Sequence, residues 1–324
     1  MKKLISLFVI VTMVVACMTF TVSANEVTSE TAFNFDGVTV NKLTADINAL
    51  GTVTLGEGQS LIVDLNGHKW TGGDIVLSVA GGSSVALVYD SSEAKTGAID
   101  VHGNDAVKIS NGELTLKDIT VKGGDGGMDA VIVEGGKVTL ENCTLSAGKA
   151  GINADNSSDE YGVSAEITVK GGKFAAYTGA KAERNCAIEL RRYDGTKFPN
   201  GPKVTLTGDI TFENAKILGQ DTYNKTIAEG VVAGAGATVE LSTEESATLD
   251  GRAYKVSTIT YTYDATAGDA GDAGDAGDAG DAGDAGDAGD AGNNPTTSDA
   301  FVVAIVTVAM IALAGVVVSK KVRA

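Results

Sequence analysis

A repeated pattern of alternating apolar residues constrains the fold of this chain more than any other feature. In each clear copy, apolar side chains stand at positions i, i+2 and i+7. The clear copies are Val63/Leu65/Trp70, Leu114/Leu116/Val121, Val138/Leu140/Leu145 and Ile167/Val169/Phe174, and weaker copies begin at Val85/Leu87 and Val204/Leu206. Alternation with a period of two residues predicts β-strands, and no stretch of helical period separates the copies.

A second short apolar segment precedes the strand in several copies. These segments are residues 106–109, 130–133, 151–154 and 187–190. Tight corners at Asn111-Gly112 and Gly135-Gly136 join the two segments, and these residue types tolerate positive φ angles. Because one such unit cannot bury its apolar face alone, we expect the units to stack and to share one core.

The region between residues 61 and 212 resembles the pectate-lyase-like right-handed parallel β-helices. The resemblance is carried by Val63-Asp64-Leu65-Asn66-Gly67-His68 and by the Asn-Gly-Glu-Leu-Thr-Leu run from Asn111. It implies an all-β solenoid of about six rungs within residues 25–264, with irregular caps at 27–50 and 231–263. An antiparallel β-sandwich is the alternative, because alternating strands joined by glycine-rich turns would also build one.

The C-terminal segment 294–324 combines a polar pentapeptide, an apolar run at 301–318 and a basic tail. The pentapeptide is Asn294, Pro295, Thr296, Thr297 and Ser298. An apolar run of this length is long enough for a transmembrane helix, and the basic tail favours the cytoplasmic side. The segment resembles a Gram-positive cell-wall sorting signal of the NPxT type. The resemblance implies that a sortase cleaves after Thr297 and links the chain to peptidoglycan; a plain membrane anchor is the alternative.

The N-terminal segment 1–24 has the organisation of a secretory signal peptide. Two lysines precede an apolar run, and small residues then predict cleavage between Ala24 and Asn25. Residues 14–17 also resemble a lipobox, so lipidation of Cys17 is an alternative. Both alternatives predict an extracellular domain displayed on the cell surface.

The charge balance limits the partners of the folded domain. The chain has 25 basic and 42 acidic residues and a formal net charge of −17, so it does not offer the basic footprint that nucleic acid binding requires. A Gly-Asp-Ala repeat beginning at Gly268 predicts that residues 265–293 form an extended, disordered acidic spacer. Cys143 and Cys186 fall in or beside predicted strands, where we expect two buried thiols; a disulfide is the alternative outside the cell.

Two aspartates are candidate metal ligands. Asp105 and Asp129 occupy equivalent places in two adjacent units, each at the start of the second segment. Strands in one sheet lie about 4.8 Å apart, so two such carboxylates could contribute to a Ca²⁺ site. The alternative is that each aspartate starts its strand by hydrogen bonding within its own turn.

A basic island between residues 181 and 203 is the candidate ligand-binding site. Its candidate contact residues are Tyr177, Arg184, Arg191, Arg192 and Tyr193. Guanidinium groups bind carboxylates in two-point fashion, and tyrosine rings offer faces for sugars, so an acidic polysaccharide or host glycan fits this island. The alternative is that these charges neutralise acidic residues nearby.

The sequence favours a non-catalytic protein. Polysaccharide hydrolases and lyases of this fold need several acidic residues on neighbouring units or calcium-binding acids with a basic residue, and we find no such set. His68 is followed by Lys69, and His102 stands alone. We therefore predict a wall-anchored module that binds polysaccharide or host glycan. A polysaccharide lyase or hydrolase, or a structural surface protein without a ligand, are the alternatives.

Overall fold

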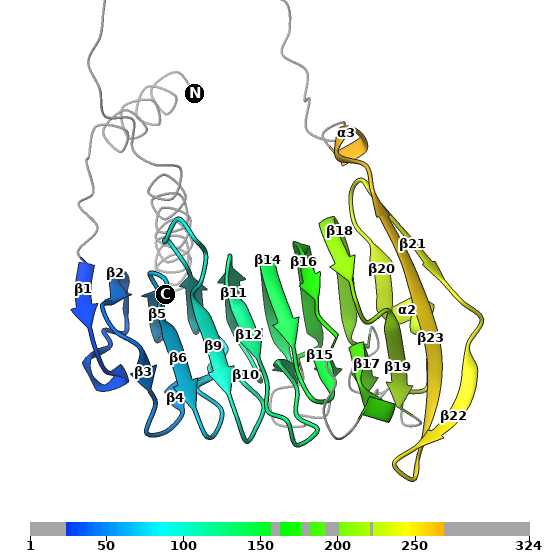
Figure 1. The fold of residues 1–324 in the computed structure, drawn as a ribbon, viewed down its shortest axis with the longest axis horizontal. Helices are drawn as coiled ribbons and strands as arrows, with labels where there is room; N and C mark the ends of the chain where they lie inside the picture. The colour runs from blue at the N-terminus through cyan, green and yellow to red at the C-terminus, as the bar shows by residue number, and fades with distance from the viewer. Residues whose placement is uncertain (1–23, 157–162, 177–181, 192–200, 221–222, 269–324) are drawn as a thin grey trace, which may run out of the picture. The chain divides into compact units, whose positions relative to one another are not determined.

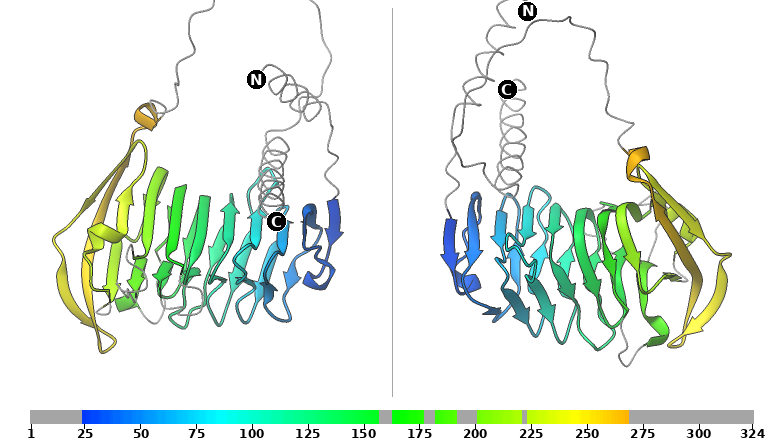
Figure 2. Two further views of the ribbon diagram at one scale, coloured as in Figure 1. Left: turned by 180° about the vertical axis from the view of Figure 1, so that it is seen from behind. Right: turned by 45° about the horizontal axis from the view of Figure 1, so that its top comes forward.

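A computed structural model describes residues 24–156, 163–176, 182–191, 201–220 and 223–268. These residues form an all-β structure with two curved, mostly parallel sheets, which is compatible with a β-helix or another solenoid. Figure 1 shows the strands following one another in chain order from β1 to β20, and Figure 2 shows the same arrangement from two further directions.

We refer to the two sheets as sheet A and sheet B. Sheet A contains β1 (Ala24–Val27), β2 (Asp36–Leu43), β3 (Ile47–Asn48), β5 (Ser60–Asp64), β6 (Lys69–Gly72), β8 (Val85–Tyr89), β9 (Ala98–Val101), β11 (Glu113–Lys117), β12 (Thr120–Lys122), β14 (Gly136–Ser146), β16 (Ala165–Phe174), β18 (Lys203–Phe212) and β20 (Val231–Ala233). Sheet B contains β4 (Val53–Leu55), β7 (Leu77–Val79), β10 (Val107–Ile109), β13 (Val131–Val133), β15 (Ala150–Asp155), β17 (Cys186–Arg191), β19 (Lys216–Gln220), β21 (Ala237–Leu241), β22 (Glu245–Leu249) and β23 (Arg252–Tyr263). The short helices are η1 (Glu30–Ala32), η2 (Ala182–Arg184), α2 (Ile227–Gly230) and α3 (Ala265–Gly268).

The predicted repeat units pair in parallel. Leu114 of β11 lies beside Val138 of β14, and Val138 lies beside Ile167 of β16. The second segments pair in the same way, with Val131 of β13 between Val107 and Ile152. The antiparallel alternative is therefore wrong for these strands. The second segment of each unit carries the chain back, so equivalent strands of successive units run in the same direction and pair in parallel.

Two of the predicted copies have a different register. Ala86 and Val88, rather than Val85 and Leu87, lie beside Leu114 and Leu116. On the next strand, β5, Leu61 and Val63 pair with Ala86 and Val88, so the copy that we began at Val63 begins two residues earlier. Both strands, β5 and β8, carry apolar residues at consecutive positions, so alternation alone did not define their inward face. Trp70 does lie in the predicted column, beside Ile99 of β9.

A bend recurs between the two halves of each unit in sheet A. Asn66, Asp118 and Asn142 have φ angles of 46°, 55° and 52°, and Gly171 follows at the corresponding place with 76°. Asparagine, aspartate and glycine are the residues that adopt the left-handed region most readily. The recurrent bend therefore has a local cause in the sequence.

The two ends of the described stack differ. At the N-terminal end β2 and β3 already pair in parallel with β5 and β6, so residues 36–48 belong to the parallel arrangement rather than to an irregular cap. At the C-terminal end β23 pairs antiparallel with β19, β21 and β22, as we expected for a closing strand pair. The β22–β23 turn is Asp250-Gly251, with φ angles of 50° and 72°, as a two-residue hairpin with a primed turn requires.

The core between the sheets is aliphatic, with a few aromatic rings toward the ends. Trp70 is fully buried and makes an edge contact with Phe33 at 5.2 Å between ring centroids. Phe174 stacks on Phe212 at 4.8 Å. Cys143 and Cys186 are both buried free thiols, so the expectation of two unbridged cysteines is confirmed.

Several predicted segments lie outside the described residues. These are the signal peptide 1–24 apart from Ala24, the lipobox cysteine Cys17, the spacer from residue 269 onward and the sorting signal 294–324 with its apolar run 301–318. Among the residues that the structure describes, no helix is long and apolar enough to span a membrane.

Candidate functional site

A cluster of buried ionic side chains lies on sheet B and is the main candidate site. Asp129 precedes β13, Lys149 precedes β15 and Glu189 lies within β17. Each of these three adjacent strands, or the segment just before it, therefore contributes one residue. Lys149 Nζ lies 2.6 Å from Asp129 Oδ2 and 3.3 Å from Glu189 Oε2. The side chains of Lys149, Asp129 and Glu189 are only 8%, 1% and 0% exposed, so this ion-pair cluster is sealed from solvent.

Hydrogen bonds hold both oxygens of Asp129. Asn153 Nδ2 donates to Oδ2 at 2.6 Å, and the backbone N–H of Ala150 donates to Oδ1 at 3.2 Å. The backbone N–H of Asp129 itself donates to Asp105 Oδ1 at 2.7 Å. The orientation of the Asp129 carboxyl group is therefore set from one neighbouring strand, β15, while Asp105 holds the Asp129 backbone.

Two arginines surround the inner face of Glu189. Arg184 Nη2 and Arg191 Nε each lie 3.8 Å from Glu189 Oε1. Arg191 also contacts Asp155 at 3.4 Å and donates to Gln220 Oε1 at 2.9 Å. Three acids (Asp129, Asp155 and Glu189) thus face three bases (Lys149, Arg184 and Arg191), so the buried charges balance, as buried ions require.

Burial changes the proton affinity of the cluster. Burial, with a smaller contribution from the neighbouring carboxylates of Glu189 and Asp105, raises the pKa of Asp129 to about 7 against the opposing effect of the Lys149 ammonium group. For Lys149, burial lowers the pKa, but Asp129 and Glu189 raise it more, and the net direction is upward. The proton shared by Lys149 and Asp129 is therefore held between two groups whose neutral forms are both favoured by burial.

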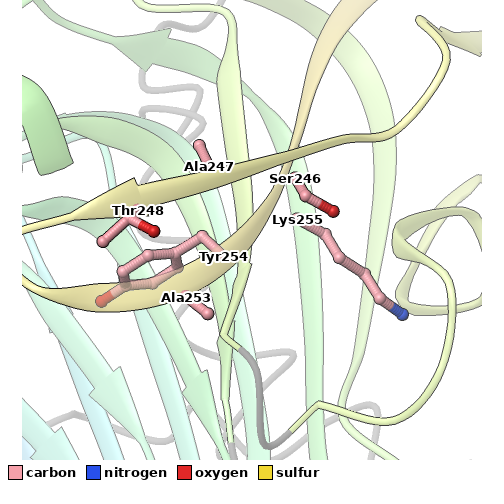
Figure 3. A pocket seen from close by; sticks show the side chains of 6 residues that line it. All are labelled: Ser246, Ala247, Thr248, Ala253, Tyr254 and Lys255. Carbon is pink, nitrogen blue, oxygen red and sulfur yellow. The ribbon is translucent and has the colours of Figure 1, made fainter.

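A shallow pocket lies at the C-terminal end of sheet B, between β22 and β23. Its volume is about 290 Å³, and its walls are Ser246, Ala247, Thr248, Ala253, Tyr254 and Lys255 (Figure 3). The hydroxyl of Tyr254 reaches Glu189 Oε1 at 3.4 Å, and the guanidinium of Arg184 lies 5.6 Å from the Tyr254 ring centroid. Tyr254 therefore separates the pocket from the ion-pair cluster.

The structure brings part of the predicted basic island together. Arg184 and Arg191 both face Glu189 and are 12% and 13% exposed, which fits the alternative that these charges neutralise nearby acids. Tyr177, Arg192 and Tyr193 lie outside the described residues. The role of the island in ligand binding stays a prediction.

The calcium hypothesis also stays a prediction. Asp105 and Asp129 are brought together, but through a backbone hydrogen bond, and Asp129 Oδ2 is 2.6 Å from the Lys149 ammonium group. Within the described ranges, no group of three or more histidine, cysteine, aspartate or glutamate side chains is arranged to hold a metal ion.

Lys149, Asn153 and Glu189 were not among the residues that the sequence singled out for function. The column that contains Asn153 and Glu189 reads Ile132, Asn153, Glu189 and Leu218 in register across four strands. Polar residues flanked by apolar ones in a short strand were the available signal. That signal does not show the partner, because Lys149 lies outside the alternating pattern.

The outer face of sheet A carries ordered columns of polar side chains. Thr115, Thr139, Thr168 and Thr205 lie in register on β11, β14, β16 and β18, and all four are half-buried. Charged residues of alternating sign flank this threonine column on both sides. They are Glu113, Lys137, Glu166 and Lys203 on one side and Lys117, Glu141 and Lys170 on the other.

Comparison with known protein families, with characterised proteins and with solved structures gives no match. The functional argument therefore depends on the sequence signals and on the geometry described above.

Proposed function

We propose that this is an extracellular, wall-anchored protein of a Gram-positive bacterium that displays a non-catalytic module for binding polysaccharide or host glycan. In this proposal the two curved sheets are faces of a right-handed parallel β-helix of about six rungs, and each rung contributes strands to both sheets. Right-handedness is expected because parallel crossover connections are almost always right-handed. The acidic spacer 265–293 separates the module from the envelope. A sortase acts at residues 294–298 and attaches the chain to peptidoglycan.

The threonine column is the observation that carries the binding proposal. Stacked strands repeat about every 4.8 Å, which is comparable to the length of one sugar unit in an extended glycan. Each threonine offers a hydroxyl for hydrogen bonding and a methyl group for the apolar face of a sugar ring. A surface that repeats in register suits a ligand that repeats.

The charges beside the column also favour a glycan. The flanking residues alternate in sign, so this face is close to neutral on a chain with a net charge of −17. A neutral face does not repel a polysaccharide that carries carboxylates. Because Arg184 and Arg191 are engaged with Glu189, we place the first glycan contacts on the threonine column.

The binding test is retention of the secreted protein on a panel of immobilised polysaccharides, with Ca²⁺ and with EDTA. The Thr139→Val/Thr168→Val variant removes two hydroxyls and keeps the branched shape of the side chains. We expect it to bind about tenfold more weakly, since two hydrogen bonds of ordinary strength are lost. Its control, Thr54→Val/Thr260→Val, removes exposed hydroxyls elsewhere and should bind like the parent.

Three outcomes would count against parts of the proposal. No retention on any polysaccharide would favour a structural surface protein. Release of uronic acids would favour a lyase. Equal binding by the two double variants would remove the threonine column from the site. Retention that disappears in EDTA would support a role for calcium in binding.

The anchoring proposal has a separate test. Replacement of Thr297 by alanine should shift the protein from the peptidoglycan fraction to the membrane fraction or the medium. Unchanged release by muralytic enzymes would contradict sortase processing at this position.

A further inference from the structure

We propose that Lys149 and Asp129 form an intramolecular amide bond, with Glu189 carrying the proton. The bond would join the segment before β13 to the segment before β15, and so would link two neighbouring units covalently. This inference does not depend on glycan binding, because the three side chains lie away from the threonine column on a different sheet.

The geometry places the reacting atoms within reach. Lys149 Nζ is 2.6 Å from Asp129 Oδ2, and the carboxyl carbon lies one C–O bond, about 1.2 Å, beyond that oxygen. Attack requires an approach of about 3–3.5 Å between the reacting atoms, so only a small rotation of the lysine side chain is needed. Asn153 and the backbone of Ala150 restrain the carboxyl group during this approach.

The atoms and charges of the reaction balance. The ammonium group of Lys149 passes one proton to Oδ2 of Asp129, which leaves a neutral amine and a neutral carboxylic acid. The amine nitrogen then attacks the carboxyl carbon, and negative charge develops on Oδ1, to which the Ala150 N–H donates. Glu189 Oε2, 3.3 Å from Nζ, takes the second proton from nitrogen and returns it to Oδ2. Oδ2 leaves as water, and an amide remains.

Burial supplies the reason for the reaction to proceed. In water an ammonium and a carboxylate are strongly hydrated, whereas at this site the side chains of Lys149 and Asp129 are only 8% and 1% exposed. Conversion of the ion pair into a neutral amide removes that desolvation cost. The position of Glu189 suits a proton carrier. Its Oε2 is buried and accepts no hydrogen bond, and it lies in ion-pair range of the Lys149 nitrogen.

The charge balance of the cluster survives the reaction. Amide formation removes one positive and one negative charge. Glu189 and Asp155 then remain opposite Arg184 and Arg191, which contact them at 3.4–3.8 Å. Removal of Lys149 alone would instead leave an excess negative charge in the core.

The test is the intact mass of the full chain, purified without heating and then denatured. We expect the protein to be lighter by one water molecule than the mass calculated from its sequence between the termini that it carries. After denaturation and digestion, trypsin should not cleave after Lys149, and fragmentation should locate the link between Lys149 and Asp129. A parent protein at its full sequence mass would overturn the proposal, whatever the variants do.

Matched variants assign the bond and the role of Glu189. Lys149→Arg keeps the positive charge but should restore the full mass. Lys117→Arg is the control, because Lys117 Nζ also lies 2.6 Å from a carboxylate, Glu141, but at a site that solvent reaches. The mass deficit of one water molecule should persist in Lys117→Arg. Glu189→Gln should leave most chains unlinked. A deficit that persists in Lys149→Arg would overturn the assignment, and complete linkage in Glu189→Gln would exclude Glu189 as the proton carrier.

Discussion

At the scale of single residues, the same contact distance has different consequences at different depths. Lys149 and Lys117 each lie 2.6 Å from a carboxylate, but Lys149 is buried, whereas Lys117 and Glu141 are 20% and 22% exposed. Solvent screens the second pair, so its net contribution to stability is small. The first pair is costly to bury and still more costly to break.

The variant Lys149→Met tests this difference. It leaves Asp129 as a buried acid without its cation, while Glu189 keeps Arg184 and Arg191, so we expect the free energy of unfolding to fall by about 3–5 kcal/mol. An amide bond in the parent would make the loss larger. Lys117→Met is the control and should change it by about 0–1 kcal/mol. Denaturant titration measures the free energy of unfolding of both variants. Equal decreases in the two variants would show that burial of the ion pair does not determine its contribution.

The two buried thiols give a second prediction at this scale. Burial raises the pKa of Cys143 to about 12, and it raises the pKa of Cys186 well above its usual range. Both cysteines therefore remain protonated and unreactive at pH 8 in the folded protein. Mass-mapped alkylation should label neither Cys143 nor Cys186 until denaturant unfolds the chain. Rapid labelling of the native protein at either position would show that the core opens there.

At the scale of the strand and its turn, glycine at a corner sets the spacing between units. Gly136 has a φ angle of 84°, and a Cβ atom added there would lie 2.6 Å from the carbonyl oxygen of Gly112 in the preceding unit. Gly112 itself has a φ angle of 86°. The predicted corners therefore require glycine both for their backbone angles and for the close contact between units.

Gly136→Ala should accordingly destabilise the protein. The left-handed conformation costs about 1–2 kcal/mol for alanine, and the contact with Gly112 adds to that cost. Gly126→Ala is the control, because nothing lies within 4 Å of the added Cβ and its φ angle is not positive. Thermal unfolding followed by circular dichroism compares the two. A Gly136→Ala variant as stable as Gly126→Ala would refute the role of the corner.

At the scale of the whole molecule, the described strands form a stack in which each unit contacts mainly its neighbours. Stability in such an arrangement is close to a sum over units and their interfaces, and the ends need protection. The antiparallel strands β21, β22 and β23 cover one end, and Tyr261 Oη donates to the carbonyl of Gly208 at 2.6 Å there. Without these strands the edge of β19 would be free to pair with other chains.

A chain that ends before β21 should therefore self-associate. We expect a truncation after Ala233 to elute as oligomers or aggregate in size-exclusion chromatography, because β19 loses its antiparallel partner. A truncation after Asp264 retains all three strands and should elute like the parent domain. A monodisperse, monomeric chain after the first truncation would show that the strands do not protect the end.

The sequence by itself determined the strands, their parallel repeat and several corners. Leu114, Val138 and Ile167 could be aligned in advance because a period of two residues and the Asn-Gly and Gly-Gly corners are local properties of the chain. The register of β5 and β8 could not be derived, since Leu61, Ile62 and Val63 are consecutive apolar residues and satisfy either face.

Only the tertiary structure decided which polar residues meet. Asp129, Lys149 and Glu189 are 20 and 40 residues apart along the chain, and stacking of β13, β15 and β17 brings them within 2.6 and 3.3 Å. Arg184 and Arg191, which suggested a ligand site in sequence, are already close to Glu189 along the chain, whereas the pairing of β15 with β17 brings Arg191 to Asp155. Local periodicity specifies the strands, whereas contacts between their side chains depend on register and loop path, which arise only when the units pack.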